Sequence, residues 1–506
     1  MKKKVWKATL LVFVLSLAAK LIAFFKSIIQ AAYFGTTQYT DAYNVSFGFV
    51  ANILYMFTTA IAVAFVPLYI RHKSVGREEG KKFASRVITF LLIFSVFITF
   101  ILLLIAPGIT TLIAPSYKGD IRQITIQYFR VMVLGFSFSL VANIYTNLLD
   151  SEKIYGFSTF GSIINSFILI AFIFLFSEQM GVWSLVVAVP VSYMAQWVML
   201  YTRGRKYGSI TFKYGLRDDS IKILIAQATP ILISQATVEI NQVVDRALLS
   251  SIGEGALTAV SYSTVLFQFA SQLMQAPLQT VMFTELSEAG AKNDDKEISN
   301  ILSSSYKLLI VLCVPVMMLI YFCGYDIVDI VYGHGRFSND AVLQAAIGLE
   351  YYSFCLLPIG IKTVLSRAYY AKQDTVRPMI LGMVEVAINI TLSILFVKPF
   401  GIKGVVGATS IASVVMIIVM LVDFNRKYIN AITMSSVKTY NKIFVGIVAV
   451  VIELIALKKC IFINSLLDFT IKTVIVFGTY FLILLALKDP SIISLWQKIK
   501  RKVTRN

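Results

Sequence analysis

The chain has 506 residues, of which 58% are hydrophobic and only 14% are charged, against about 25% charged residues in an ordinary soluble domain. Apolar runs long enough to cross a lipid bilayer recur from one end of the sequence to the other, and they exclude a soluble globular protein. The formal net charge is +19. The cations gather in short loops between the apolar runs, where they indicate membrane orientation and contact with anionic lipid instead of nucleic-acid binding.

Apolar segments along the chain predict an all-α integral membrane protein with about fourteen transmembrane helices. The first segment could pass for a signal peptide, but its apolar region exceeds the ~7–15 residues of such peptides and no small-residue cleavage site follows it. We therefore expect it to be a retained span. The predicted spans are 6–34, 41–70, 83–114, 121–150, 155–177, 181–202, 219–250, 256–287, 300–332, 340–371, 377–397, 401–424, 440–459 and 463–487.

Alternate loops differ in charge, and this predicts the orientation. One set contains "MKKKVWK", "RHKSVGREEGKKFASR", "RGRKYGSITFKYGLR", "NRK" and "KIKRKVTR", whereas the other set holds few cations. Cation-rich short loops stay in the cytoplasm. The sequence therefore predicts a multi-pass membrane protein with both termini in the cytoplasm.

A weak internal echo suggests two related halves. "DAYNVSF" at 41–47 and "AFVPLY" at 64–69 resemble "LTAVSY" at 257–262 and "VMFTEL" at 281–286. Repeated halves are common in transporters, whose substrate sites lie at the repeat interface. We predict an N-terminal lobe, a C-terminal lobe, and a terminal helix pair with a basic tail; their ranges are 1–215, 216–430 and 431–506.

Two lysines lie inside the first predicted span. Lys20 is near the bilayer centre, whereas Lys26 is close enough to the outer end of its helix to reach the interface. An unpaired lysine at the centre of a membrane helix costs at least ~2.5–3.5 kcal/mol. Lys20 should therefore face either a hydrated cavity that receives an anionic substrate or a fixed carboxylate. Glu239 and Asp245, which share the same six-residue spacing, are candidate acidic partners. Alternatively, Asp245 and Arg246 form a local cap and interface pair near the outer end of their helix.

No pattern for catalysis is present. The chain lacks GxSxG and HExxH motifs, and its two histidines lie in separate loops. The loop "VYGHGRFSND" at 331–340 is either a phosphate-binding loop or a plain turn, and it does not match the GxxxxGK[ST] pattern. We therefore expect transport and not enzymatic activity, and no bound cofactor.

The elements "TDAYNVSFGF" and "AFVPLY" resemble the MurJ/MviN family of lipid II flippases. The resemblance continues through "INQVVDRALLSS" at 240–251, "VYGHGRF" at 331–337 and "YYAKQDTVRPMI" at 369–380. It implies two pseudo-symmetric six-helix lobes around a central cavity, followed by a C-terminal helix pair. It also implies alternating access that moves an undecaprenyl-diphosphate-linked cell-wall precursor, similar to lipid II, from the inner to the outer leaflet.

The resemblance also implies a binding site for that substrate. Lys20 and Lys26 fall at positions where the family carries basic residues on helix one. Gln30, one turn beyond Lys26, and Asp41 of the TDAY element complete the predicted substrate-binding set. The chain lacks two further family arginines, because Tyr55–Met56 on helix two and Val265 on helix eight stand in their places.

Some members of the family bind sodium between helices seven, eleven and twelve. The residues of this chain that match in type and spacing are Asp245, Asn389, Val405 and Thr409, whereas Ser393 replaces a second acid. Glu385, one turn before Asn389, could compensate for the missing acid or carry a proton instead. Sodium or proton coupling is therefore an expectation from the resemblance.

Several other functions compete with lipid II transport. The nearest alternative is a flippase for another polyprenyl-diphosphate oligosaccharide of the capsule or O-antigen type. A drug exporter of the same fold would favour an acidic cavity over two lysines, and a non-transporting scaffold would tolerate their neutralisation. The expected partners are a polyprenyl-diphosphate-linked sugar, the lipid bilayer and proteins of cell-wall synthesis, without nucleic acid.

Overall fold

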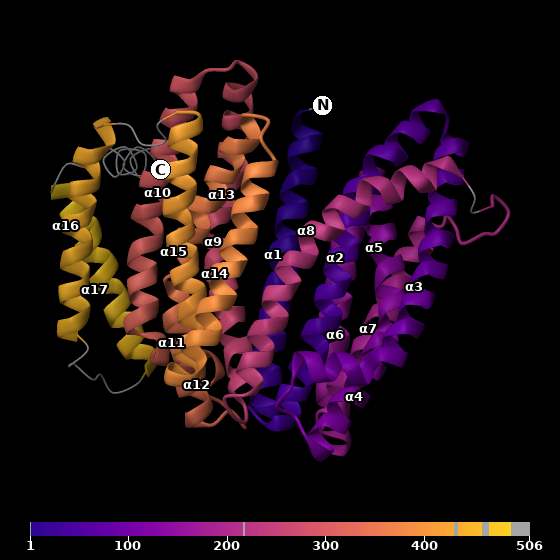
Figure 1. Ribbon diagram of the computed structural model, residues 1–506, viewed down its shortest axis with the longest axis horizontal. Coiled ribbons are helices and arrows are strands. Elements are labelled where there is room, and N and C mark those ends of the chain that lie inside the picture. The colour runs from indigo at the N-terminus through magenta and orange to yellow at the C-terminus, as the bar shows by residue number, and fades with distance from the viewer. Residues whose placement is uncertain (1, 216–217, 430–433, 458–464, 487–506) are drawn as a thin grey trace. The chain divides into compact units, whose positions relative to one another are not determined.

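The computed structural model describes residues 2–215, 218–429, 434–457 and 465–486. Helices account for most of these residues, and the described parts contain no β-strand (Figure 1). The helices are α1 (Lys2–Phe34), α2 (Gln38–Val75), α3 (Arg77–Ile113), α4 (Gly119–Val133), α5 (Gly135–Ser151), α6 (Tyr155–Met180), α7 (Trp183–Gly204), α8 (Asp219–Ser250), α9 (Ala256–Ala291), α10 (Asp295–Phe322), α11 (Gly324–Tyr332), α12 (Asn339–Ser353), α13 (Leu356–Ala371), α14 (Val376–Phe400), α15 (Ile402–Lys427), α16 (Met434–Leu457) and α17 (Ser465–Ala486).

The helical membrane architecture predicted from the sequence is confirmed. Within the described residues, 12 helical segments are long and apolar enough to cross a membrane. Helices α9 and α16 lie where the remaining two spans were predicted. The predicted basic tail at the C-terminus falls outside the described residues.

Three predicted spans are each divided into two helices. The breaks lie at Leu134 between α4 and α5, at Cys323 between α10 and α11, and before Leu356 at the start of α13. Two of the second helices begin with glycine, and a Cβ at Gly135 would lie 2.8 Å from a ring carbon of Tyr193. In α13, Pro358 occupies the first turn, where a missing N–H is tolerated. Close packing and proline therefore end these helices where the apolar pattern continues.

The chain forms two compact units. Unit 1 contains residues 1–258 and 334–338, and unit 2 contains residues 259–333 and 339–506. Helix α8, the first helix of the predicted C-terminal lobe, packs against α2 and α3 and so belongs to unit 1. The predicted lobes, with boundaries at 215 and 430, are the parts expected to move in a transporter. Compact units do not test how parts move, so these boundaries stay a prediction.

Unit 1 is built around α2. This helix packs against α3, α4, α5 and α8, whereas α1 packs against α6. Large aromatic side chains fill the interior of the unit, among them the fully buried Phe65, Phe83, Phe129 and Phe136. Aromatic rings supply much buried area with few rotatable bonds, and they hold α2 in a fixed orientation.

Unit 2 has its own helix pairs. Helices α14 and α15 form one pair, α10 packs against α13, and α16 and α17 pack against α10. The last contact buries an apolar cluster that includes Leu319, Leu454, Val476 and Leu484. The terminal helix pair is therefore attached to unit 2 through side chains typical of a protein interior.

The two units share local geometry, which supports the predicted internal repeat. Gly181 joins α6 to α7 with φ 53° and ψ −136°, and Gly401 joins α14 to α15 with φ 56° and ψ −130°. Such a conformation is available mainly to glycine. The turns before α6 and α14 also match, because Lys153 and Gln373 both adopt positive φ, 62° and 59°.

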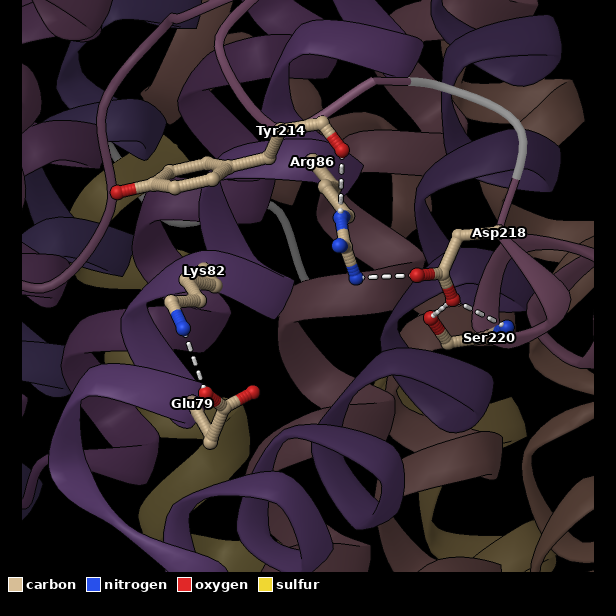
Figure 2. Close-up of polar contacts among 6 residues, drawn as sticks. All are labelled: Glu79, Lys82, Arg86, Tyr214, Asp218 and Ser220. Atoms are coloured by element: carbon tan, nitrogen blue, oxygen red, sulfur yellow. Dashed lines mark hydrogen bonds and ion pairs between the residues drawn. The ribbon is translucent and has the colours of Figure 1, made fainter.

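The loop between α7 and α8 is tied to α3 by polar contacts. The backbone N–H groups of Ser209 and Thr211 each donate a 3.0 Å hydrogen bond to a hydroxyl of α3. Arg86 of α3 donates to the Tyr214 carbonyl oxygen at 3.1 Å and pairs with Asp218 (Figure 2). These contacts fix the position at which the chain enters α8.

Asp218 is the residue immediately before α8. It accepts a 2.8 Å hydrogen bond from the backbone N–H of Ser220, as a helix N-cap does. The Ser220 hydroxyl and backbone N–H, followed by the Arg86 guanidinium, hold the pKa of the Asp218 carboxyl below its usual value. Asp218 is therefore negatively charged at neutral pH and favourably placed at the positive end of the helix dipole.

Candidate functional site

The two lysines of α1 lie in different surroundings within unit 1. The Lys20 side chain is exposed, whereas Lys26 is half-buried. The Lys26 ammonium lies 6.0 Å from the centroid of the Phe47 ring on α2, which is at the outer limit of a cation–π contact. A ring face attracts a cation but does not neutralise it.

Neither lysine is neutralised by a carboxylate of the described residues. The ion pairs found in these parts of the chain involve other side chains throughout. The alternative in which a fixed carboxylate holds Lys20 in place therefore has no observed partner. Lys20 and Lys26 are cations that an anionic ligand could neutralise.

Gln30 and Asp41, the other predicted substrate-binding residues, are buried. Gln30 is 6% exposed and Asp41 is 2% exposed. A bound substrate cannot reach either side chain in this conformation. Their assignment to the substrate site stays a prediction.

Asp41 instead organises the start of α9 and the turn that precedes it. Its carboxylate accepts hydrogen bonds from the backbone N–H groups of Gly255 at 2.7 Å and Thr258 at 2.8 Å, and from the Thr258 hydroxyl at 2.6 Å. Asn44, one turn along α2, donates to the same Thr258 hydroxyl at 3.0 Å. The two halves of the internal echo, 41–47 and 257–262, therefore meet at these residues.

A stripe of polar and small residues on α2 continues this contact along α8. Asn44, Gly48 and Asn52 are spaced four residues apart and so lie on one face of the helix. The Asn52 amide donates to Gln242 at 2.7 Å, and a Cβ at Gly48 would lie 2.9 Å from Nε of Arg246. We call the contact of α2 with α8 and with the start of α9 the polar seam. Its residues are Asp41, Asn44, Gly48, Asn52, Glu239, Gln242, Arg246 and Thr258.

Glu239 pairs with an arginine of its own helix. Arg246 donates from Nη1 to Glu239 at 3.3 Å and from Nη2 to Gln242 at 3.1 Å. Asp245 accepts from the Asn241 amide at 3.4 Å. The predicted pairing of these acids with the lysines of helix one is therefore not among the contacts of the described residues.

The predicted sodium ligands are divided between the units. Asp245 belongs to unit 1, and the other four belong to unit 2. In unit 2, Asn389 is 4% exposed and Ser393 is fully buried, with the Ser393 hydroxyl 3.4 Å from the Asn389 amide oxygen. Thr409 donates to the Val405 carbonyl oxygen at 3.4 Å. These oxygens fit a hard cation in chemistry.

Glu385, the alternative coupling residue, has a partner that the sequence did not indicate. Lys362 of α13 donates to its carboxylate at 2.7 Å, and Ser413 of α15 donates at 3.2 Å. Lys362 lies 23 residues before Glu385 in the sequence, too far away for the two to form a recognisable motif. Only the packing of α13 beside α14 brings the two charges together.

The glycines of the loop after α11 serve a backbone contact. Arg336 donates its N–H to the Ala32 carbonyl oxygen of α1 at 2.8 Å. Gly335 has φ 65°, and a Cβ there would lie 2.4 Å from that same oxygen. Gly35, with φ 59°, approaches the Arg336 carbonyl oxygen equally closely. This geometry favours the turn, because the glycines are explained by the close approach of the loop backbone to the end of α1.

Solved structures define the class of protein to which this fold belongs. The fold is similar to that of "Lipid II flippase MurJ, inward closed conformation", with a TM-score of 0.80 and 22% identity, covering 94% of this chain and 98% of that chain. It is also similar to an inward-facing multidrug resistance MATE family transporter of the MOP superfamily, with a TM-score of 0.69 and 15% identity, covering 82% and 97%. The chain therefore shares the multi-span helical fold of these two membrane proteins.

Sequence comparison then identifies the family. The sequence model described as "Lipid II flippase MurJ" matches residues 30–477. A relative from Treponema pallidum, described as "Probable lipid II flippase MurJ", is 24% identical over 442 residues, covering 84% of this chain and 83% of the relative. The chain belongs to the MurJ family. The match begins after Lys20 and Lys26, so their roles rest on this chain's own residues.

The Asp41 contacts predict a measurable loss of order in the turn before α9. Replacing Asp41 with Ala leaves three donors without their acceptor and should lower the free energy of unfolding by about 3 kcal/mol. Hydrogen exchange at residues 255–258, followed by mass spectrometry in detergent, should become faster. Asp41→Asn, which keeps one acceptor oxygen, should lose less.

The matched control is Asp120→Asn, which alters an exposed acid in the first turn of α4. Asp120→Asn should leave the free energy of unfolding and the rate of hydrogen exchange at residues 255–258 unchanged. Exchange in the turn that is as slow in Asp41→Ala as in the wild type would show that the carboxylate does not hold it.

Proposed function

We propose that this protein is a lipid II flippase that moves its substrate from the inner to the outer leaflet of the bacterial plasma membrane. Membership of the family supports the substrate class. The observation that carries the proposal is the pair of cations on α1, Lys20 and Lys26, for which no described carboxylate serves as partner. A diphosphate is an anionic group that such cations bind.

The proposed route separates the head group of the substrate from its tail. Lys20 and Lys26 attract the diphosphate and sugar, which cannot cross hydrocarbon alone, while the undecaprenyl chain stays in lipid. The membrane potential, negative inside, favours outward movement of an anion by ~2.3 kcal/mol per charge per 100 mV. The two predicted lobes, 1–215 and 216–430, then rock to give the head group access to each side in turn.

Two replaced family arginines bear on the choice between lipid II and another lipid-linked oligosaccharide as the substrate. The family's helix-two arginine is replaced by Tyr55, which is 63% exposed, and its helix-eight arginine by Val265. These changes alone would admit another polyprenyl-diphosphate oligosaccharide. The relatives are described as lipid II flippases, and lipid II is therefore the substrate we propose.

We also propose that the protein acts without catalysis, in a membrane where both termini face the cytoplasm. Cation-rich loops support the orientation. The partners implied are the bilayer, the lipid-linked precursor and, through the use of that precursor, proteins of cell-wall synthesis.

Sodium coupling is the second part of the proposal. The oxygens of Asn389, Ser393, Val405 and Thr409, which all belong to unit 2, would hold the ion; sodium return down its gradient would reset the transporter. Sodium, compared with potassium, should raise the thermal unfolding temperature of the wild-type protein but not of Asn389→Ala. An equal response to both salts in the wild type would rule this ion out.

The lysines give the main prediction about transport. Lys20→Gln and Lys26→Gln should each lower the rate of lipid II flipping in reconstituted vesicles by about tenfold or more, because each removes a charge-assisted contact of ~1.5–3 kcal/mol. Lys20→Arg and Lys26→Arg keep the charge and should retain most of the rate.

The control for these variants is Lys118→Gln, which neutralises an exposed lysine before α4. Thermal unfolding should show that every variant is folded. Wild-type flipping by both glutamine variants would remove the basis of the proposed function.

A further inference from the structure

Arg246 and Glu239 form an ion pair within a membrane span. Both side chains are 14% exposed. A buried ion pair is weak evidence for stability, because apolar residues of similar volume often stabilise a protein as well or better. Ionisable residues inside a membrane span usually mark a functional site. The pair therefore calls for a role beyond packing α8 against α2.

The guanidinium of Arg246 is incompletely used. It has five N–H donors, and the described residues accept from two of them, at 3.3 Å by Glu239 and at 3.1 Å by Gln242. A strong charge-assisted contact is shorter, at about 2.7–2.9 Å. Gly48 leaves room for the guanidinium directly beside the α2 backbone. The Arg246 side chain therefore has a long contact with the Glu239 carboxylate and a close packing contact with Gly48.

Arg246 and Lys26 both reach the same turn of α2. The Arg246 guanidinium lies beside Gly48, and the Lys26 ammonium lies 6.0 Å from the ring centroid of the preceding residue, Phe47. Consecutive residues project about 100° apart around a helix, so the two cations approach α2 from different sides of this turn. Arg246 is thus a cation of unit 1 on the same part of α2 as the proposed substrate site.

We propose that Arg246 is a third cationic contact for the diphosphate of the substrate, and that Glu239 occupies its guanidinium while the site is empty. The planar fork of arginine binds phosphate oxygens in pairs, which a lysine cannot do. Arg246 therefore supplies the geometric selectivity that Lys20 and Lys26 lack. This inference rests on the proposed function and names the residue that compensates for the arginines absent from helices two and eight.

Binding of short-chain probes to the purified full-length protein tests the inference. The probes are farnesyl diphosphate and farnesyl monophosphate, measured by native mass spectrometry or thermophoresis in detergent. Arg246→Gln should weaken binding of the diphosphate about tenfold and that of the monophosphate less. Glu239→Gln should tighten diphosphate binding several-fold in the wild-type background and have no effect when Arg246 is already Gln.

Control variants separate this inference from the proposed function. Arg130→Gln, at an exposed arginine of α4, should bind like the wild type. If Lys26→Gln weakens diphosphate binding but Arg246→Gln and Glu239→Gln do not change it, the role of Arg246 is wrong and the proposed function stands. If Lys20→Gln and Lys26→Gln also bind normally, the proposed function fails as well.

Folding of the variants does not limit the test. Should Arg246→Gln fail to fold, Arg246→Lys keeps the charge and loses the fork, and it should lose the preference for diphosphate over monophosphate. An unchanged preference in Arg246→Lys, together with unchanged affinity in Glu239→Gln, would overturn the inference.

Discussion

A charged side chain inside a lipid bilayer requires a partner or water, because hydrocarbon supplies neither. Unit 1 meets this requirement for its buried acids: Asp41 accepts three hydrogen bonds, and Glu239 pairs with Arg246. Lys20 and Lys26 differ, since no described carboxylate neutralises them. An anionic head group would supply a partner for these lysines. The proposed transport activity depends on this difference between the paired acids and the lysines that lack a carboxylate partner among the described residues.

Helix α2 connects the parts of the site. Its first turns hold the chain before α9 through Asp41, and the next turn presents Phe47 to Lys26 and Gly48 to Arg246. One helix therefore contacts the proposed substrate cations and the turn that leads towards unit 2.

Much of the fold could be predicted from the sequence, because apolar length and loop charge are local properties. The short turn at Gly181 and the two lysines of α1 belong to this group. The break at Leu134 was missed, since it arises where Gly135 packs against Tyr193 of another helix. The role of Asp41 was also missed, because its partner Thr258 lies 217 residues away. The spacing of Asn44, Gly48 and Asn52 was the available signal for the polar seam.

Complementation of a bacterial strain depleted of its lipid II flippase tests the central claim most directly, with the accumulated lipid-linked intermediates identified by mass. The account predicts that the wild-type chain restores growth and clears lipid II, whereas a chain with both Lys20 and Lys26 changed to Gln is present in the membrane and leaves lipid II accumulated. Full rescue by the doubly neutralised chain would contradict it, and so would a wild-type chain that never clears lipid II.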